Sequence, residues 1–167
     1  MGKIILVGTL YGLGTYLLLF CIGLLLTRIK LIHKLPVVWE DVNAITVLKA
    51  LIVAPLVEEA IFRYLPITVI FLRTSDTKII WAVVIFCSVL FGRTHGSTYC
   101  ILQQGVGGLV LSAAFLQEGY FAAVIEHSLV NVINIVMPCA LKIPSFQRCP
   151  HGGHFNPFNT QTPPSPQ

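Results

Sequence analysis

A long uncharged run of apolar residues near the N-terminus constrains the fold more than any other feature of this chain. It covers residues 4–26, which is 23 residues. A helix rises 1.5 Å per residue, so this run would measure roughly 34 Å, enough to cross the hydrocarbon core of a bilayer. Within it, Gly8 and Gly12 have the spacing of small residues that let membrane helices pack closely. The run therefore predicts a membrane-spanning helix.

Composition extends this prediction to the whole chain. Of 167 residues, 55% are hydrophobic and only 11% are charged, whereas soluble domains are about one quarter charged. Four more apolar stretches follow, at residues 44–72, 79–91, 99–116 and 120–137. We therefore expect an all-α, polytopic transmembrane helix bundle of about five spans over residues 1–141, in contact with the lipid bilayer. The net charge of +4 is scattered without a basic stripe, so a nucleic acid partner is not expected.

The second stretch and the C-terminal tail depart from regular helical patterns. Pro55 and Pro66 interrupt the second stretch, and a proline removes a helix hydrogen bond, so a kink or break is expected near Pro55. Residues 142–167 are rich in Pro, Gly and Asn and have no periodicity, which predicts a disordered tail. Its segment CPHGGH, residues 149–154, could bind a soft metal but is more simply explained as adventitious.

The distribution of Lys and Arg between the spans favours one orientation in the membrane. One side would hold five such residues and the other side three, counted as Arg28, Lys30, Lys34, Lys142 and Arg148 against Lys3, Arg73 and Lys78. Because basic residues accumulate on the cytoplasmic side, this count favours an N-terminus outside and a C-terminus inside.

Three charged residues lie inside the second apolar stretch, in the segment APLVEEAIFRYLP. A charge at the centre of a membrane helix costs ~2.5–3.5 kcal/mol, so Glu58, Glu59 and Arg63 together would cost on the order of 8–10 kcal/mol if unpaired. They must therefore be paired or line a wet cavity. Glu59 and Arg63 are four apart on one helix face and can neutralise each other. Glu58 points about 100° away around the helix and is left free for chemistry.

Other polar groups occur on two further stretches. His95 follows the third stretch by four residues from Phe91, and the last stretch carries His127 and Asn131, which are also four apart. Helical spacing puts His127 and Asn131 on one face. Glu58, His95, His127 and Asn131 thus come from three different spans. If they converge, they form a small polar chamber in an apolar bundle.

Each of these residues also has a simpler explanation when taken alone. A histidine near a helix end is commonly an interfacial residue, and a membrane asparagine commonly forms a hydrogen bond between helices. Glu59 and Arg63 can be a purely structural pair, and Phe91 can be core packing. Glu126, next to His127 but on a different face, has no assigned role. The combination of polar groups on three otherwise apolar spans favours a functional site.

Three short motifs resemble those of a known family. EEAIFR, residues 58–63, matches an EExxxR motif; FGRTH, residues 91–95, matches FxxxH; and HSLVN, residues 127–131, matches a histidine followed four residues later by Asn or Asp. In this order, each on its own span, they resemble the CAAX-processing and bacteriocin-processing family of intramembrane proteases. The resemblance covers about residues 44–137.

The resemblance implies an activity and a set of roles. The chain would be an intramembrane endopeptidase of the glutamate type, in which Glu58 activates water without a metal ion or another cofactor. His95 would hold that water, and His127 and Asn131 would donate to the oxyanion. Glu59, Arg63 and Phe91 would support the site. The substrate would be a membrane-associated protein or peptide carrying a CAAX-type, leader or sorting signal; the chain is shorter than many members, which leaves this choice open.

Three other functions compete with this interpretation. Glu58, His95 and His127 could be a zinc set of two histidines and one glutamate, although the spacing is not HExxH. The chain could instead be a non-enzymatic immunity factor, chaperone or scaffold. A proton or ion pathway is the third alternative, since carboxylates inside membranes also mark those, but no inverted repeat supports it.

Overall fold

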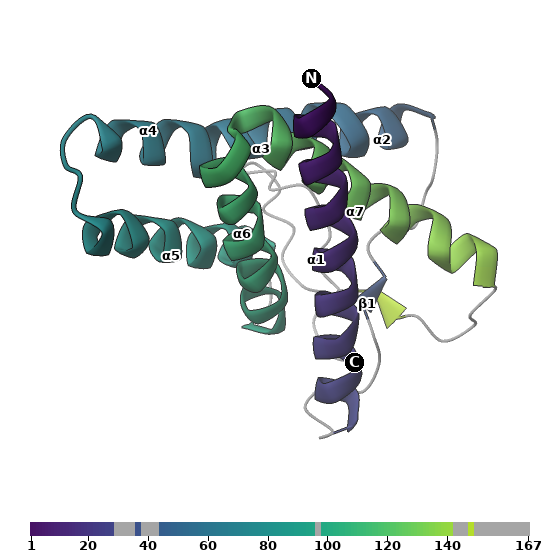
Figure 1. The fold of residues 1–167 in the computed structure, drawn as a ribbon. Coiled ribbons are helices and arrows are strands. Elements are labelled where there is room, and N and C mark those ends of the chain that lie inside the picture. The colour runs from purple at the N-terminus through teal and green to yellow at the C-terminus, as the bar shows by residue number, and fades with distance from the viewer. Residues whose placement is uncertain (29–35, 38–43, 96–97, 142–146, 149–167) are drawn as a thin grey trace, which may run out of the picture.

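Five helical segments carry the fold, at the places that the five apolar stretches predict (Figure 1). The computed structural model describes residues 1–28, 36–37, 44–95, 98–141 and 147–148. The segments are α1 (Gly2–Arg28), a continuous helical stretch from α2 (Ala44–Leu48) to α4 (Leu65–Phe71), α5 (Thr77–Thr94), α6 (Thr98–Glu118) and α7 (Tyr120–Leu141). The all-α prediction is confirmed, and the helices extend beyond most of the predicted stretches by a few residues.

The only described extended structure is a pair of two-residue strands, in which β1 (Pro36–Val37) runs parallel to β2 (Gln147–Arg148). This pair joins the connection after α1 to the C-terminal segment. The remaining tail residues, including the CPHGGH segment, lie outside the described residues. The predictions of tail disorder and of an adventitious metal motif therefore stay predictions.

Within the part of the chain that the structure describes, two helices are long and apolar enough to cross a membrane by length and composition, at Gly2–Leu25 and Thr77–Thr94. The apolar part of α7, Tyr120–Val136, is shorter. Along α1, Leu6, Leu10 and Leu17 are each more than half exposed. Such a leucine surface is suited to contact with lipid tails rather than with water.

The second segment stays helical through both prolines because its hydrogen-bond pattern widens before each of them. A π-helical turn, η1 (Lys49–Val53), precedes α3 (Ala54–Glu59), and a second one, η2 (Ala60–Tyr64), precedes α4. Pro55 and Pro66 each lie at the start of the α-helical piece that follows, where a missing N–H is tolerated. The predicted kink or break near Pro55 is therefore realised as π-helical turns, and Glu58 and Glu59 lie between them.

Close contacts through small residues assemble the segments. Helix α1 packs against α7 and α6, and α5 packs against α6; in Figure 1 α1 runs in front of α7. A Cβ atom on Gly8 would lie 2.8 Å from the carbonyl oxygen of Ala122, so the predicted Gly8 packing position is confirmed. The tight connection between α6 and α7 depends on Gly119, whose φ of 82° is in the left-handed region that favours glycine.

Candidate active site

The predicted pair of Glu59 and Arg63 lies at the centre of the bundle. Arg63 Nη1 donates to Glu59 Oε1 at 3.0 Å, and both side chains have no exposed area. The guanidinium carbon of Arg63 also lies 4.3 Å from the centre of the Phe91 ring, a cation–π distance. Glu59 Oε2 has no hydrogen-bond partner among the described residues. The pair is therefore fully desolvated, and each charge depends on the other.

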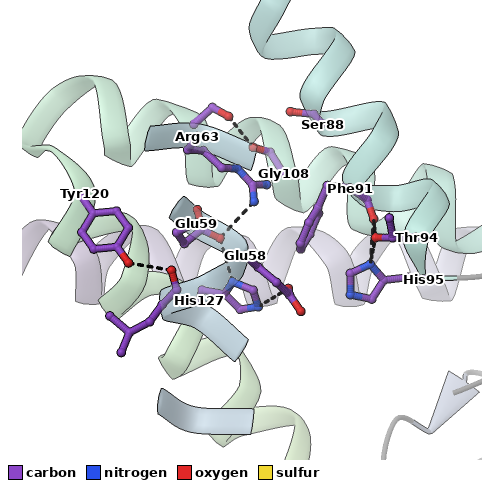
Figure 2. Close-up of polar contacts among 12 residues, drawn as sticks. Glu58, Glu59, Arg63, Ser88, Phe91, Thr94, His95, Gly108, Tyr120 and His127 are labelled. Carbon is purple, nitrogen blue, oxygen red and sulfur yellow. Dashed lines mark hydrogen bonds and ion pairs between the residues drawn. The ribbon is translucent and has the colours of Figure 1, made fainter. Parts of the chain in front are cut away.

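His127 connects this buried pair to the more accessible Glu58 (Figure 2). Its Nδ1 lies 2.8 Å from Glu59 Oε1, and its Nε2 lies 3.7 Å from Glu58 Oε2. Because Glu59 is the acceptor also used by Arg63, the proton between Glu59 and His127 belongs on Nδ1. This hydrogen bond fixes the tautomer and the ring orientation. The Glu58 side chain keeps 30% of its area exposed, so it is the carboxylate of the two that water can reach.

His95 approaches the same place from the end of α5. It caps that helix, and its Nδ1 lies 2.8 Å from the carbonyl oxygen of Phe91. The ring centre of Phe91 is 4.7 Å from that of His95 and 5.8 Å from that of His127. In Figure 2 the carboxylate of Glu58 is drawn between the two imidazole rings. Three of the four predicted catalytic residues therefore gather around Phe91, which is itself 1% exposed.

Asn131 lies one helical turn beyond His127 and takes part in a contact between helices. Its Nδ2 donates to the carbonyl oxygen of Ala50, in η1, at 2.8 Å. This is the hydrogen bond between helices considered above as its simpler role. An amide nitrogen carries two hydrogens, so one N–H of Asn131 stays available for a second acceptor.

Two further contacts of α7 with the proline-containing segment were missed by the sequence reasoning. Ser128 Oγ donates to the carbonyl oxygen of Leu51 at 2.8 Å, and the Tyr120 hydroxyl donates to that of Leu56 at 2.6 Å. For the Ser128 contact the signal in the sequence is Pro55, which takes the α-helical donor from the Leu51 carbonyl. The Leu56 carbonyl also accepts from the N–H of Ala60, so Pro55 gives no signal for the Tyr120 contact.

Glu126, next to His127 in the chain, contacts α1. Its Oε1 accepts a hydrogen bond of 2.6 Å from Thr15, and the side chain is fully buried. Its Oε2 has no hydrogen-bond partner among the described residues. Glu126 had no role in the sequence analysis, and the structure gives it a contact with the N-terminal helix.

The zinc alternative concerns the same side chains. Among the residues that the structure describes, no three or more His, Cys, Asp or Glu side chains are grouped so as to hold a metal ion. Each histidine has Nδ1 engaged, by Glu59 or by the Phe91 carbonyl, and could offer Nε2 to a metal ion, which is a common arrangement for histidine ligands. The zinc alternative therefore stays open, and the roles proposed below are derived from the side chains alone.

Comparison with known protein families places the three motifs in a family. The family model for Rce1-like proteins, described as type II CAAX prenyl endopeptidase Rce1-like, matches residues 40–133, which is more than half of the chain. The matched region includes all three motifs and confirms the resemblance inferred from them. No curated protein and no solved structure matches the chain.

Proposed function

The chain belongs to the Rce1-like family of type II CAAX prenyl endopeptidases, and on that premise we propose that it hydrolyses a peptide bond of a membrane-associated substrate with a water molecule activated by Glu58. The observation that carries this proposal is the position of His127, with Nδ1 on Glu59 and Nε2 toward Glu58. A prenylated protein ending in a CAAX-type sequence is the substrate class that the family description favours.

Glu58 is the general base in this proposal. It is the more exposed of the two adjacent carboxylates, and a base must be within reach of the water it deprotonates. Water gives a proton to Glu58 while its oxygen bonds to the scissile carbonyl carbon, and the carbonyl π electrons move to oxygen as an oxyanion. When the intermediate collapses, the C–N bond breaks and the amine leaves with the proton held by Glu58.

Glu59 and Arg63 act on the reaction through His127. Arg63 donates to Glu59, and Glu59 holds the Nδ1–H of His127, so that Nε2 is directed to the space beside Glu58. The arrangement has the logic of a carboxylate that orients a histidine in a catalytic triad. His95, whose Nδ1 is held by the Phe91 carbonyl, would offer its Nε2 to the same water.

Two donors are available for the oxyanion. The second N–H of Asn131 is one of them, since the first is used by the Ala50 carbonyl. His127 is the other, but it can donate from Nε2 only when both ring nitrogens carry a proton. Preorganised donors of this kind each contribute about 3–4 kcal/mol of transition-state stabilisation in other hydrolases.

The membrane sets how the substrate arrives. We infer a multi-pass arrangement in which all five helical segments cross or enter the bilayer, with the site inside it. Glu58 lies on a segment whose neighbours Leu56 and Val57 are exposed apolar residues. A lipid-anchored substrate would therefore enter laterally from the membrane and not from bulk water.

The test is cleavage of a farnesylated CAAX peptide in detergent by the wild-type chain and by Glu58→Gln, with metal content measured on both. Glutamine keeps the shape of Glu58 and removes the base. Cleavage by wild type, a loss of about a thousandfold or more in kcat for Glu58→Gln, and no stoichiometric metal would support the proposal. If the wild type contains a stoichiometric zinc ion and cleavage is lost together with that ion, the metalloprotease alternative would be supported. Unchanged cleavage by Glu58→Gln would overturn the assignment of Glu58.

A non-enzymatic membrane immunity or scaffold protein is distinguished in the cell. For such a protein, a growth or protection phenotype would be the same for wild type and for Glu58→Gln, because the two side chains have nearly the same volume. The enzyme predicts that the phenotype is lost with the base.

A further inference from the structure

Pro55 leaves two carbonyl oxygens of η1 without their usual donors. In an α-helix the carbonyl of Leu51 would accept from the N–H of residue 55, which proline lacks. The N–H of Ala54 bonds to the carbonyl of Lys49 instead of to that of Ala50. The donor that would serve Ala50 in a π turn is again residue 55. The Ala50 carbonyl must therefore find a partner outside its own helix or remain unsatisfied inside the bundle, and the Leu51 carbonyl has lost its α-helical donor.

Side chains of α7 supply both partners. Ser128 Oγ donates to the Leu51 carbonyl and Asn131 Nδ2 donates to the Ala50 carbonyl, each at 2.8 Å. We name these two hydrogen bonds the carbonyl clamp. His127 is the neighbour of Ser128 in the chain, and Pro55 lies three residues before Glu58. The clamp thus joins the helix that carries the histidine to the helix that carries the glutamates, next to the place where the two meet.

We propose that Ser128 is a positioning residue of the active site, which together with Asn131 holds the carbonyls released by Pro55 and so fixes Glu58 and Glu59 against His127. The effect of Ser128 on catalysis rests on the proposed function, whereas the two hydrogen bonds of the clamp do not. Asn131 then has two duties, one N–H in the clamp and the other toward the oxyanion.

The geometry explains why a proline and a π-helical turn stand beside the catalytic carboxylates. A regular helix would satisfy its own carbonyls and could slide or rotate against α7 without losing hydrogen bonds. A helix with two exposed carbonyl acceptors has one register in which Ser128 and Asn131 reach both of them. Catalytic geometry is sensitive to such register, since a misplacement of 1 Å can cost about a hundredfold in rate.

A thermodynamic cycle between Ser128 and Pro55 tests the clamp. Ser128→Ala leaves the Leu51 carbonyl unpaired, so the melting temperature in detergent should fall by about 2–8 °C. Pro55→Ala returns an N–H to position 55, which can serve that carbonyl from within the helix. In the Pro55→Ala background, Ser128→Ala should then lower the melting temperature by less than half as much. Equal losses in both backgrounds would overturn the clamp.

The matched control is Ser112→Ala. Ser112 Oγ also makes a 2.8 Å hydrogen bond to a carbonyl, that of Gly108, and is fully buried, but the bond lies within its own helix. Its effect on the melting temperature should be the same in the wild-type background and in the Pro55→Ala background. A dependence as large as that of Ser128→Ala would mean that Pro55→Ala changes the whole bundle and would refute the specific link.

The effect on catalysis is measured separately. Ser128→Ala should lower kcat by about ten- to a hundredfold with little change in KM. Pro55→Ala should also lower kcat without lowering the melting temperature, a combination that loss of folding cannot produce. Unchanged kcat in both variants would overturn the positioning role. If the wild type cleaves no peptide but the effect of Ser128→Ala on the melting temperature depends on Pro55, the clamp is supported and the proposed function fails. If the wild type cleaves the peptide and that dependence is absent, the proposed function is supported and the clamp fails.

Discussion

Replacing Arg63 with methionine removes the partner of a carboxylate that has no contact with solvent. Glu59 and Arg63 are both fully buried, and their hydrogen bond is 3.0 Å long. Breaking a buried ion pair from one side costs about 3–5 kcal/mol, because the remaining charge is left without compensation. The contact of Arg63 with the Phe91 ring adds about 1–2 kcal/mol. The 2.8 Å contact of His127 with Glu59 remains and offsets part of this loss.

The total expected loss for Arg63→Met is therefore about 3–6 kcal/mol, a large part of the stability of a domain this size. Removing Glu59 as well, in Glu59→Leu/Arg63→Met, takes away the uncompensated charge. The double variant should regain about 2–4 kcal/mol of that loss. The double variant should have no proteolytic activity, because His127 then has no acceptor for its Nδ1–H.

Denaturant unfolding in detergent of the wild type, both single variants and the double variant gives the coupling energy between the two positions. A coupling below about 1 kcal/mol would refute the reasoning, because it would mean that the two charges are not each other's compensation. A double variant with full activity would refute the role of Glu59 in orienting His127.

Two further predictions concern the surroundings of the site. A Cβ on Gly108 would lie 2.8 Å from Arg63 Nη2, so Gly108→Ala should cost about 1–3 kcal/mol; Gly14→Ala, where nothing lies within 4 Å, is the control and should be neutral or slightly stabilising in unfolding assays. Glu126→Gln keeps the acceptor for Thr15 and should retain both activity and stability, whereas Thr15→Val should cost about 1–3 kcal/mol because it leaves the buried Glu126 carboxyl unsatisfied. A stable but inactive Glu126→Gln would instead indicate that Glu126 carries a proton in the reaction.

Local spacing was sufficient to predict the parts of the site that lie within one helix. Glu59 and Arg63 are four residues apart, so any helix brings them together, and the cost of unpaired charge in a membrane made the pairing predictable. The five helical segments follow from the apolar stretches for the same reason. The gathering of Glu58, His95 and His127 followed only from the three motifs together, since no spacing within one helix can specify contacts between helices.

The contacts between helices join residues that are far apart in the sequence, so local spacing does not predict them. Which nitrogen of His127 meets Glu59, and which meets Glu58, is decided by the depth at which α7 packs. The link between Thr15 and Glu126 joins residues 111 positions apart, and nothing near either residue indicates the other. The π-helical turns were hidden because proline predicts only that a hydrogen bond is missing, and not how the neighbouring turns rearrange.

These hidden contacts have a common cause, which bears on how the site is held together. In a membrane the helices gain little from apolar contact with one another, since lipid is equally apolar. Their relative positions must then depend on close packing and on polar contacts, as at Gly8 against Ala122 and at Ser128 against the Leu51 carbonyl. A proline leaves backbone carbonyl oxygens without a donor in their own helix. These carbonyls then accept hydrogen bonds from side chains of the neighbouring helix. The polar residues beside the motifs are therefore as much a part of the site as the motifs themselves, because they set the register in which Glu58 meets His127.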